Sequence, residues 1–207
     1  MPSKVEPMRS VWKQAYLEVR RPRRFIAACL LGVMLCPFYP TDYGSYPPAD
    51  TSQGVYALDH YVRFVNTAAQ ALLPVVFADK IGMVQLVYVA VSTTLATHGF
   101  KRVVDRWQIW DTRVGQRPSG PNSRFNMPSG HSSMASSAAY FVGRRYGWWH
   151  SLYLIPILLL TMYARVALDT HTVAAVIAGA LIGLAMAAIF TSMRKLPAAP
   201  AAAPVEA

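Results

Sequence analysis

The chain has 207 residues, of which 54% are hydrophobic and only 14% are charged, and its formal net charge is +10. A soluble domain usually carries about 25% charged residues, so this composition argues against a soluble protein and favours a membrane protein built as one compact domain. The positive charge does not indicate a nucleic-acid partner, because the basic residues cluster between apolar segments instead of forming one basic stripe.

The first 24 residues are basic and place Trp12, Tyr16 and Leu17 at helical spacing. This pattern predicts an interfacial helix on an anionic membrane surface, with a disordered tail as the alternative. The apolar sequence that follows has no convincing small-residue cleavage site, so we expect a retained anchor rather than a cleaved signal peptide.

Apolar segments separated by polar loops make up most of the remaining chain. We predict transmembrane helices at residues 25–39, 57–77, 81–100, 132–145, 152–168 and 173–190. The expected fold is therefore all-α: a polytopic membrane protein with six transmembrane helices and an N-terminal interfacial helix. Its predicted parts are a basic segment at 1–24, a membrane domain at 25–193 and a disordered tail at 194–207.

Two details of these helices bear on packing. Cys29 and Cys36 are seven residues apart in the first apolar segment, too far apart for a disulfide. Small residues in the last segment, among them Gly179 and Gly183, suit close packing against another helix.

The loop charges predict the orientation in the membrane. With six spans, one side carries the N-terminal basic run together with Lys80, Arg144, Arg145, Arg194 and Lys195. The positive-inside bias makes this side cytoplasmic, so both termini would be cytoplasmic. The loops at 40–56, 101–130 and 166–172 would then face outward together. The second of these is itself rich in Lys and Arg, which calls for a reason other than topology.

A polar loop at residues 117–131 contains three prolines and two glycines. Small and apolar residues follow Pro128-Ser129-Gly130-His131 and predict a helix, which would place Ser129 at a helix N-terminus. Free backbone N–H groups and the positive end of the helix dipole favour an anion there. Gly130 would let the backbone approach a ligand closely, and His131 would bring a titratable proton.

A second basic element lies at the outer end of the fifth span, where Arg165 and His171 are six residues apart. Arginine deep in a membrane protein is usually partnered or functional. Arg117 and Arg165, with Arg113 or Lys101, would clamp a phosphate between two histidines. Such an arrangement suits phosphoryl transfer through a phosphohistidine: one imidazole attacks phosphorus, the other protonates the leaving oxygen, and cations stabilise the charge. No metal-ligand spacing is visible, so we expect neither a metal nor another cofactor.

These motifs resemble a known family. Arg117-Pro118, Pro128-Ser129-Gly130-His131, and Arg165 followed after five residues by His171 are similar to the three-part signature of the type 2 phosphatidic acid phosphatase and haloperoxidase superfamily. The resemblance covers roughly residues 60–190 and implies a six-helix membrane bundle with metal-independent dephosphorylation. It implies His171 as the nucleophile, His131 as the general acid, and a phosphate site made by Arg117, Ser129, Gly130 and Arg165.

Three positions depart from the family pattern. Trp110 stands where the family has a basic residue, for which Arg113 or Lys101 would substitute. Ala164 replaces the serine that usually precedes the later arginine. Ala175 replaces the aspartate that usually orients the nucleophilic histidine, so that the imidazole tautomer must be fixed by Asp169 or by a backbone carbonyl.

The resulting hypothesis is an enzyme of the bacterial inner membrane that removes phosphate from an envelope lipid at the periplasmic face. The lipids considered are undecaprenyl diphosphate, lipid A phosphate and phosphatidylglycerol phosphate, and the form of the motifs favours the first two. One alternative is a phosphotransferase that passes the phosphate to a second lipid such as lipid A. Another is a non-catalytic protein that binds anionic lipid, which Ala175 motivates.

Overall fold

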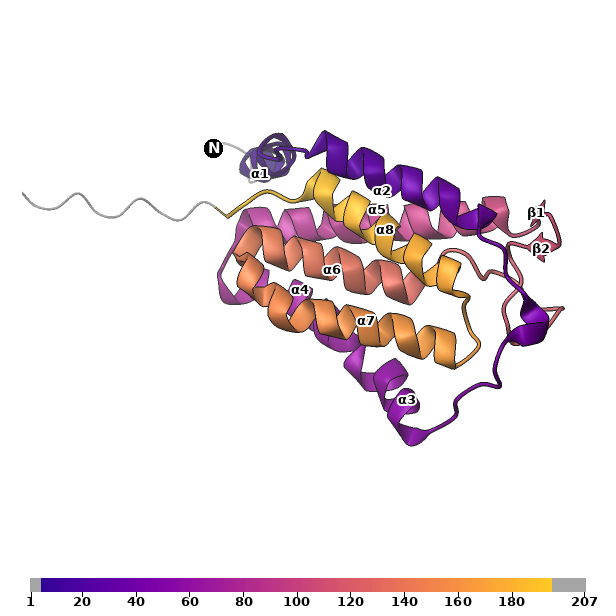
Figure 1. Cartoon of the computed structure of the whole chain (residues 1–207). Coiled ribbons are helices and arrows are strands. Elements are labelled where there is room, and N and C mark those ends of the chain that lie inside the picture. Colours follow the sequence, from indigo (N-terminus) through magenta and orange to yellow (C-terminus); the bar gives the residue numbers. More distant parts are fainter. Residues whose placement is uncertain (1–4, 195–207) are drawn as a thin grey trace, which may run out of the picture.

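A computed structural model describes residues 5–194 of the chain as a helical bundle with one very short β-ribbon (Figure 1). The elements are α1 (Val5–Leu17), α2 (Arg23–Leu35), α3 (Gln53–Ala57), α4 (Phe64–Val76), α5 (Lys80–Val104), β1 (Gln108–Ile109), β2 (Thr112–Arg113), α6 (Gly130–Tyr146), α7 (Ser151–Ala167) and α8 (Val173–Phe190). The predicted helical fold is confirmed. The predicted disordered tail lies outside the described residues, apart from Arg194.

The long helices lie side by side, and the extended connections gather at one end of the bundle (Figure 1). These connections are the ones before α3, between α5 and α6, and between α7 and α8. They bond to one another, since the Thr41 backbone N–H donates to Thr112 Oγ1 at 3.1 Å and the Asp50 N–H donates to the Ala167 carbonyl at 2.8 Å. The prediction that these loops lie together is confirmed.

Among the described residues, three helical segments are long and apolar enough to cross a membrane: Lys80–Val104, Trp148–Ala167 and Val173–Phe190. A full crossing needs about 20 residues. By contrast, α2 and α4 have 13 residues each and α6 has 17. The chain is thus a helical membrane protein, and the count of six spans stays a prediction.

Two predicted boundaries were wrong in ways that affect the site. Helix α5 continues to Val104, so Lys101 lies in its last turn rather than in a loop. The second predicted span is divided into α3, a π-helical turn at Leu58–Val62, and α4. Turns of this kind often mark functional positions, because the wider turn redirects the side chains around it.

Helix α6 packs closely against α8 in the centre of the bundle. A Cβ atom added at Gly179 would overlap the Ser129 carbonyl oxygen, and one added at Gly183 would overlap the Ser133 carbonyl oxygen. The Ser129 backbone N–H donates to the Ala175 carbonyl at 2.9 Å. The predicted close packing of small residues is confirmed, and it fixes the start of α6 beside the start of α8.

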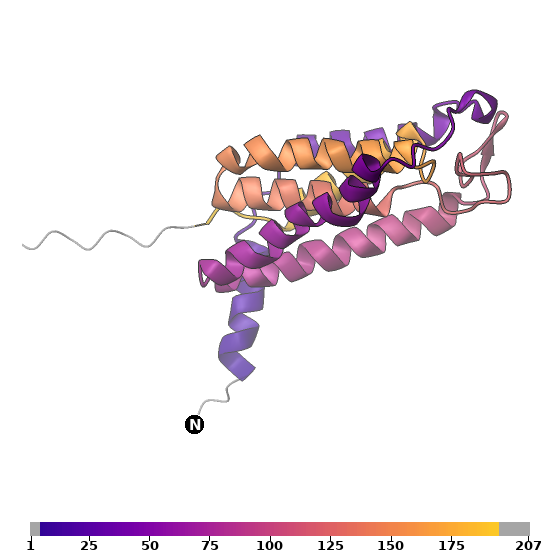
Figure 2. The ribbon, with the colours of Figure 1, turned by 90° about the horizontal axis from the view of Figure 1, so that it is seen from below.

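The end of the bundle opposite the loops is held by a buried ion pair. Arg145 donates to both carboxylate oxygens of Asp79, each at 2.6 Å. Arg145 also donates to Gln85 at 3.1 Å, and Gln85 donates to the Ala15 carbonyl at 2.8 Å. These bonds attach α1 to the bundle, which it meets at a steep angle (Figure 2). Of the two alternatives for the N-terminal segment, the structure shows a helix at Val5–Leu17, and its position on a membrane surface stays a prediction.

The close contact of α6 with α8 predicts a position-specific cost of added volume. We expect Gly183→Ala to lower the free energy of unfolding by about 1–3 kcal/mol, because the new methyl group forces the two helices apart. The matched control is Gly99→Ala, at a helical position where a Cβ meets no atom within 4 Å. It should be neutral or stabilising by up to about 1 kcal/mol, since Ala favours helix more than Gly. Thermal unfolding in one detergent compares them, and equal shifts would contradict the packing.

Candidate active site

His171 lies in the connection between α7 and α8 and is only 3% exposed. Its Nδ1 atom is 2.6 Å from the backbone carbonyl oxygen of Asn126. A carbonyl oxygen only accepts hydrogen bonds, so Nδ1 carries the hydrogen and Nε2 keeps its lone pair. The geometry leaves Nε2 as the nucleophilic atom of this imidazole.

Asn126 holds the His171 connection in place through its side chain as well. Its Nδ2 donates to Thr172 Oγ1 at 3.1 Å, and its Oδ1 accepts from the Thr172 backbone N–H at 3.0 Å. Thr172 in turn caps α8 by accepting from the Ala175 N–H at 3.3 Å. Sequence analysis missed Asn126, because the group that orients His171 is its backbone carbonyl and every residue has one.

Two groups were predicted as alternatives for orienting His171: Asp169 and a backbone carbonyl. Asp169 lines a separate outer pocket, and the Asn126 carbonyl makes the contact with Nδ1. Ala175 itself is fully buried in an apolar cluster with Val104 and Met127. The Asp169 alternative is therefore wrong and the backbone-carbonyl alternative is confirmed.

Three cations surround His171. Burial lowers the pKa of His171 well below its ordinary value, and the charges of Lys101, Arg165 and Arg117 lower it further, against the opposing effect of the Asn126 carbonyl. The imidazole is thus neutral at neutral pH. Lys101 comes from the last turn of α5, Arg117 from the loop before α6, and Arg165 from the end of α7.

The two arginines of this group keep donors available. Arg165 is 8% exposed and donates from Nη1 to Asp59 Oδ1 at 2.8 Å. Arg117 donates from Nη2 to the Phe125 carbonyl at 3.5 Å. Among residues 5–194, the buried Nε of each arginine has no acceptor. Buried N–H groups are nearly always bonded, so these donors suit an oxyanion.

The start of α6 contributes backbone donors. Gly130 and His131 are its first two residues, so their N–H groups have no carbonyl acceptor one turn earlier in the helix. A Cβ at Gly130 would meet no atom within 4 Å, so the space beside it is open. Ser129 is fully buried, and its hydroxyl caps α6 by accepting from the Ser132 N–H at 3.5 Å. Its side chain supports the helix start.

His131 meets a residue that the motifs do not contain. Its Nε2 contacts Nη1 of Arg63, which directly follows the π-helical turn. Asp59, in the same turn, lies between Arg165 at 2.8 Å and Arg63 at 4.0 Å. In the sequence, the contact between Arg63 and His131 was signalled only by the presence of a charged residue, Arg63, within an apolar segment.

Arg113 does not join the group. Its Nη2 donates to the carbonyls of Pro121 and Ser123, each at 2.6 Å, so it holds the loop before α6 together. Of the two residues predicted to substitute for the family's basic residue, Lys101 acts electrostatically on His171 and Arg113 binds the loop instead. In the same loop, Arg124 pairs with Asp105 at 2.6 Å.

Two small cavities adjoin the site. One of about 240 Å³ is lined by His98, Lys101, Arg102, Arg117 and Phe125. The other, of about 60 Å³, is lined by Arg63, Phe64, Thr67, His131 and Met134. His98, to which the sequence assigned no role, is thus beside the cationic group.

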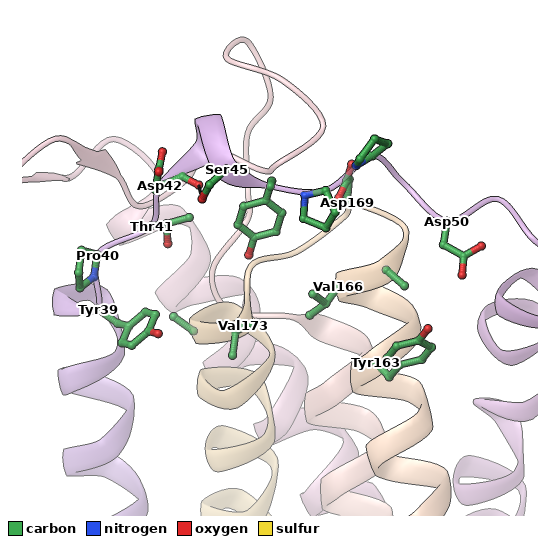
Figure 3. Close-up of a pocket in the computed structure, with 15 residues that line it drawn as sticks. Tyr39, Pro40, Thr41, Asp42, Ser45, Asp50, Tyr163, Val166, Asp169 and Val173 are labelled. Carbon is green, nitrogen blue, oxygen red and sulfur yellow. Dashed lines mark hydrogen bonds between the residues drawn. The ribbon is translucent and has the colours of Figure 1, made fainter.

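A larger pocket of about 590 Å³ lies under the loop that follows α2 (Figure 3). Tyr39, Asp42, Tyr163 and Asp169 are among its lining residues, whereas the residues predicted for catalysis and phosphate binding are not. Within residues 5–194, no group of three or more His, Cys, Asp or Glu side chains is placed to hold a metal ion.

The sequence pattern of the PAP2 superfamily matches residues 82–197, more than half of the chain. The chain belongs to the PAP2 superfamily. The resemblance identified from the three motifs is confirmed.

Curated PAP2 relatives agree with this assignment. Lipid A 1-phosphatase of Helicobacter pylori strain J99 is 38% identical over 194 residues, which cover 90% of this chain and 97% of that protein. Lipid A 1-phosphatase of strain 26695 is 42% identical over 137 residues, 66% of this chain and 71% of that one. Lipid A 4'-phosphatase of strain J99 is 37% identical over 134 residues, 64% and 65% of the two chains.

A solved structure shows a weaker likeness. The crystal structure of the first transmembrane PAP2 type phosphatidylglycerolphosphate phosphatase from Bacillus subtilis aligns over 89% of this chain and 84% of that chain. The sequence identity is 19% and the TM-score is 0.42, which is too low to add to the assignment.

The bonds of Asn126 predict that its side chain stabilises this PAP2 fold. We expect Asn126→Ala to lower the free energy of unfolding by about 2–4 kcal/mol, because it leaves the buried Thr172 N–H without its acceptor. Asn122→Ala, in the exposed part of the same loop, is the control and should change it by less than about 0.5 kcal/mol. Thermal unfolding measures both, and equal stabilities would contradict the anchoring role.

The lowered pKa of His171 predicts an acid-sensitive fold. In the unfolded chain a histidine has a pKa of about 6.5, so below that pH the unfolded state binds more protons than the folded state. Stability should therefore fall with pH, by up to about 1.4 kcal/mol per pH unit. Between about pH 7 and pH 5 the wild type should lose more thermal stability than His171→Asn, whose amide can still donate to the Asn126 carbonyl. Equal losses would mean that His171 protonates freely in the folded protein.

Proposed function

We propose that this protein is an integral membrane phosphatase that hydrolyses the phosphate of lipid A, or of a closely related envelope lipid, through a phosphohistidine. The observation that most strongly supports this proposal is the neutral, oriented imidazole of His171 among Lys101, Arg117 and Arg165. The named relatives, two lipid A 1-phosphatases and a lipid A 4'-phosphatase, favour lipid A over undecaprenyl diphosphate and phosphatidylglycerol phosphate.

In the first step His171 Nε2 attacks phosphorus. The N–P bond forms as the bond from phosphorus to the leaving oxygen breaks. His131, which takes up a proton at Nε2 in place of its contact with Arg63 when the anionic substrate binds, gives that proton to the leaving oxygen. The three cations and the first N–H groups of α6 stabilise the charge on the equatorial oxygens.

In the second step water attacks the phosphohistidine. His131, now neutral, accepts a proton from the water, and inorganic phosphate leaves as His171 is regenerated. Arg165 acts on both histidines electrostatically, so one guanidinium serves the whole cycle. Its pairing with Asp59 fixes its position.

The Asn126 carbonyl weakens the argument for the alternative of a non-catalytic lipid binder. The binder alternative rested on the missing aspartate at Ala175, and the carbonyl supplies an acceptor for His171 Nδ1 in its place. A phosphotransferase would use the same residues with a lipid acceptor in place of water.

The basic loops support a location in the bacterial inner membrane, with cytoplasmic termini and a periplasmic site. In this orientation the lipid bilayer presents the substrate's phosphate to the loop end of the bundle. The negative charge of that phosphate accounts for the basic residues of the outward-facing loop, which the positive-inside bias does not explain.

Phosphate release from purified protein tests the function. In detergent with chelator present, the wild type should release phosphate from lipid A 1-phosphate. His171→Ala should lose more than about a thousandfold of the rate, and His131→Ala about a hundredfold or more. His150→Ala, at the opposite end of the bundle, should keep the activity.

Other outcomes have definite meanings. A reaction restored by metal and abolished by chelator would refute metal independence. Phosphate transfer only in the presence of a second lipid would identify a transferase. Lipid binding without any turnover on lipid A 1-phosphate, undecaprenyl diphosphate or phosphatidylglycerol phosphate would establish the binder instead.

A further inference from the structure

Arg63 lies beside His131, apart from the cations that surround His171. Its Nη1 contacts His131 Nε2 directly. The small cavity next to it is lined by Arg63 and His131 and by none of Lys101, Arg117, Arg165 or His171. The site therefore has a fourth cation on the side of the proton donor.

The charge of Arg63 is incompletely neutralised within the protein. Its nearest carboxylate, Asp59, is 4.0 Å away and makes its shorter contact, at 2.8 Å, with Arg165. The Arg63 guanidinium also lies over the Phe64 ring at 4.6 Å from the centroid. Its buried Nε has no acceptor in the part of the chain that the structure describes.

The same cavity reaches the outside of the bundle. Phe64 is 49% exposed and Met134 is 45% exposed, and both line it together with Arg63. Apolar side chains at this opening suit a surface that meets lipid. A lipid leaving group can thus extend from His131 past Arg63 toward the membrane.

The reaction geometry assigns this place to the leaving group. In an in-line displacement the leaving oxygen is opposite the nucleophile, His171 Nε2, and next to the acid, His131. A cation at that point stabilises negative charge on the leaving group. A sugar or lipid alcohol leaves without charge once it is protonated, whereas a second phosphate remains an anion.

We propose that Arg63 binds a phosphate on the leaving group, so that the enzyme acts faster on a lipid diphosphate than on the monophosphate of the same lipid. This inference rests on the proposed phosphatase function and specifies its substrate class. In the step concerned, the His171 N–P bond forms at the terminal phosphorus and the bond to the bridging oxygen breaks. His131 protonates that oxygen, and the leaving group is the lipid monophosphate, whose phosphate is bound by Arg63.

The test compares matched substrates that differ only in one phosphate: lipid A 1-diphosphate with lipid A 1-phosphate, and undecaprenyl diphosphate with undecaprenyl phosphate. We expect Arg63→Gln to lower kcat/KM about ten- to hundredfold more for each diphosphate than for its monophosphate, since a charge-assisted hydrogen bond is lost. Arg63→Lys should retain part of the preference, because it keeps the charge.

Arg106→Gln is the control, since it removes the same charge from an exposed position on the loop side of the bundle. It should leave the preference unchanged. Equal loss on both substrates in Arg63→Gln, with reduced thermal stability, would overturn the inference in favour of a structural role. In that case turnover by the wild type would still support the proposed function, whereas absence of turnover on all four lipids would defeat the function itself.

Discussion

The contact between α6 and α8 determines how the rest of this site is built. Helices approach this closely only where side chains are absent, and Gly179 and Gly183 provide that on α8. The Ser129 N–H then reaches the Ala175 carbonyl and sets the two helix starts side by side. His131 at the start of α6 and His171 just before α8 consequently belong to neighbouring helix starts.

Electrostatic compensation is the second constraint. Lys101, Arg117 and Arg165 repel one another, and burial makes the repulsion stronger than it would be in water. Asp59 offsets part of it through its ion pair with Arg165, and in the proposed function a bound phosphate offsets more of it.

The imidazole of His171 can be oriented by more than one kind of hydrogen-bond acceptor. A carboxylate and a backbone carbonyl both accept the Nδ1 hydrogen, but only the carboxylate adds a negative charge. In this chain the carbonyl of Asn126 leaves His171 exposed to the uncompensated field of three cations. Burial, and after it these cations, make the imidazole a weaker base, so it stays unprotonated over a wider range of pH.

The sequence by itself determined the helical membrane class, the order of the helices and the residues of the three motifs. These follow from apolar run length and from local chemistry at Pro128-Ser129-Gly130-His131. It did not determine that Lys101 rather than Arg113 joins Arg117, because that depends on one more turn of α5 and on carbonyls that bind Arg113. Nor did it reveal the Asn126 carbonyl, since a backbone group leaves no mark in the sequence. Asp59 in the π-helical turn contacts Arg165 of α7, and Arg63 after that turn contacts His131 of α6. Only the tertiary structure decides these contacts, because the residues are far apart in the sequence.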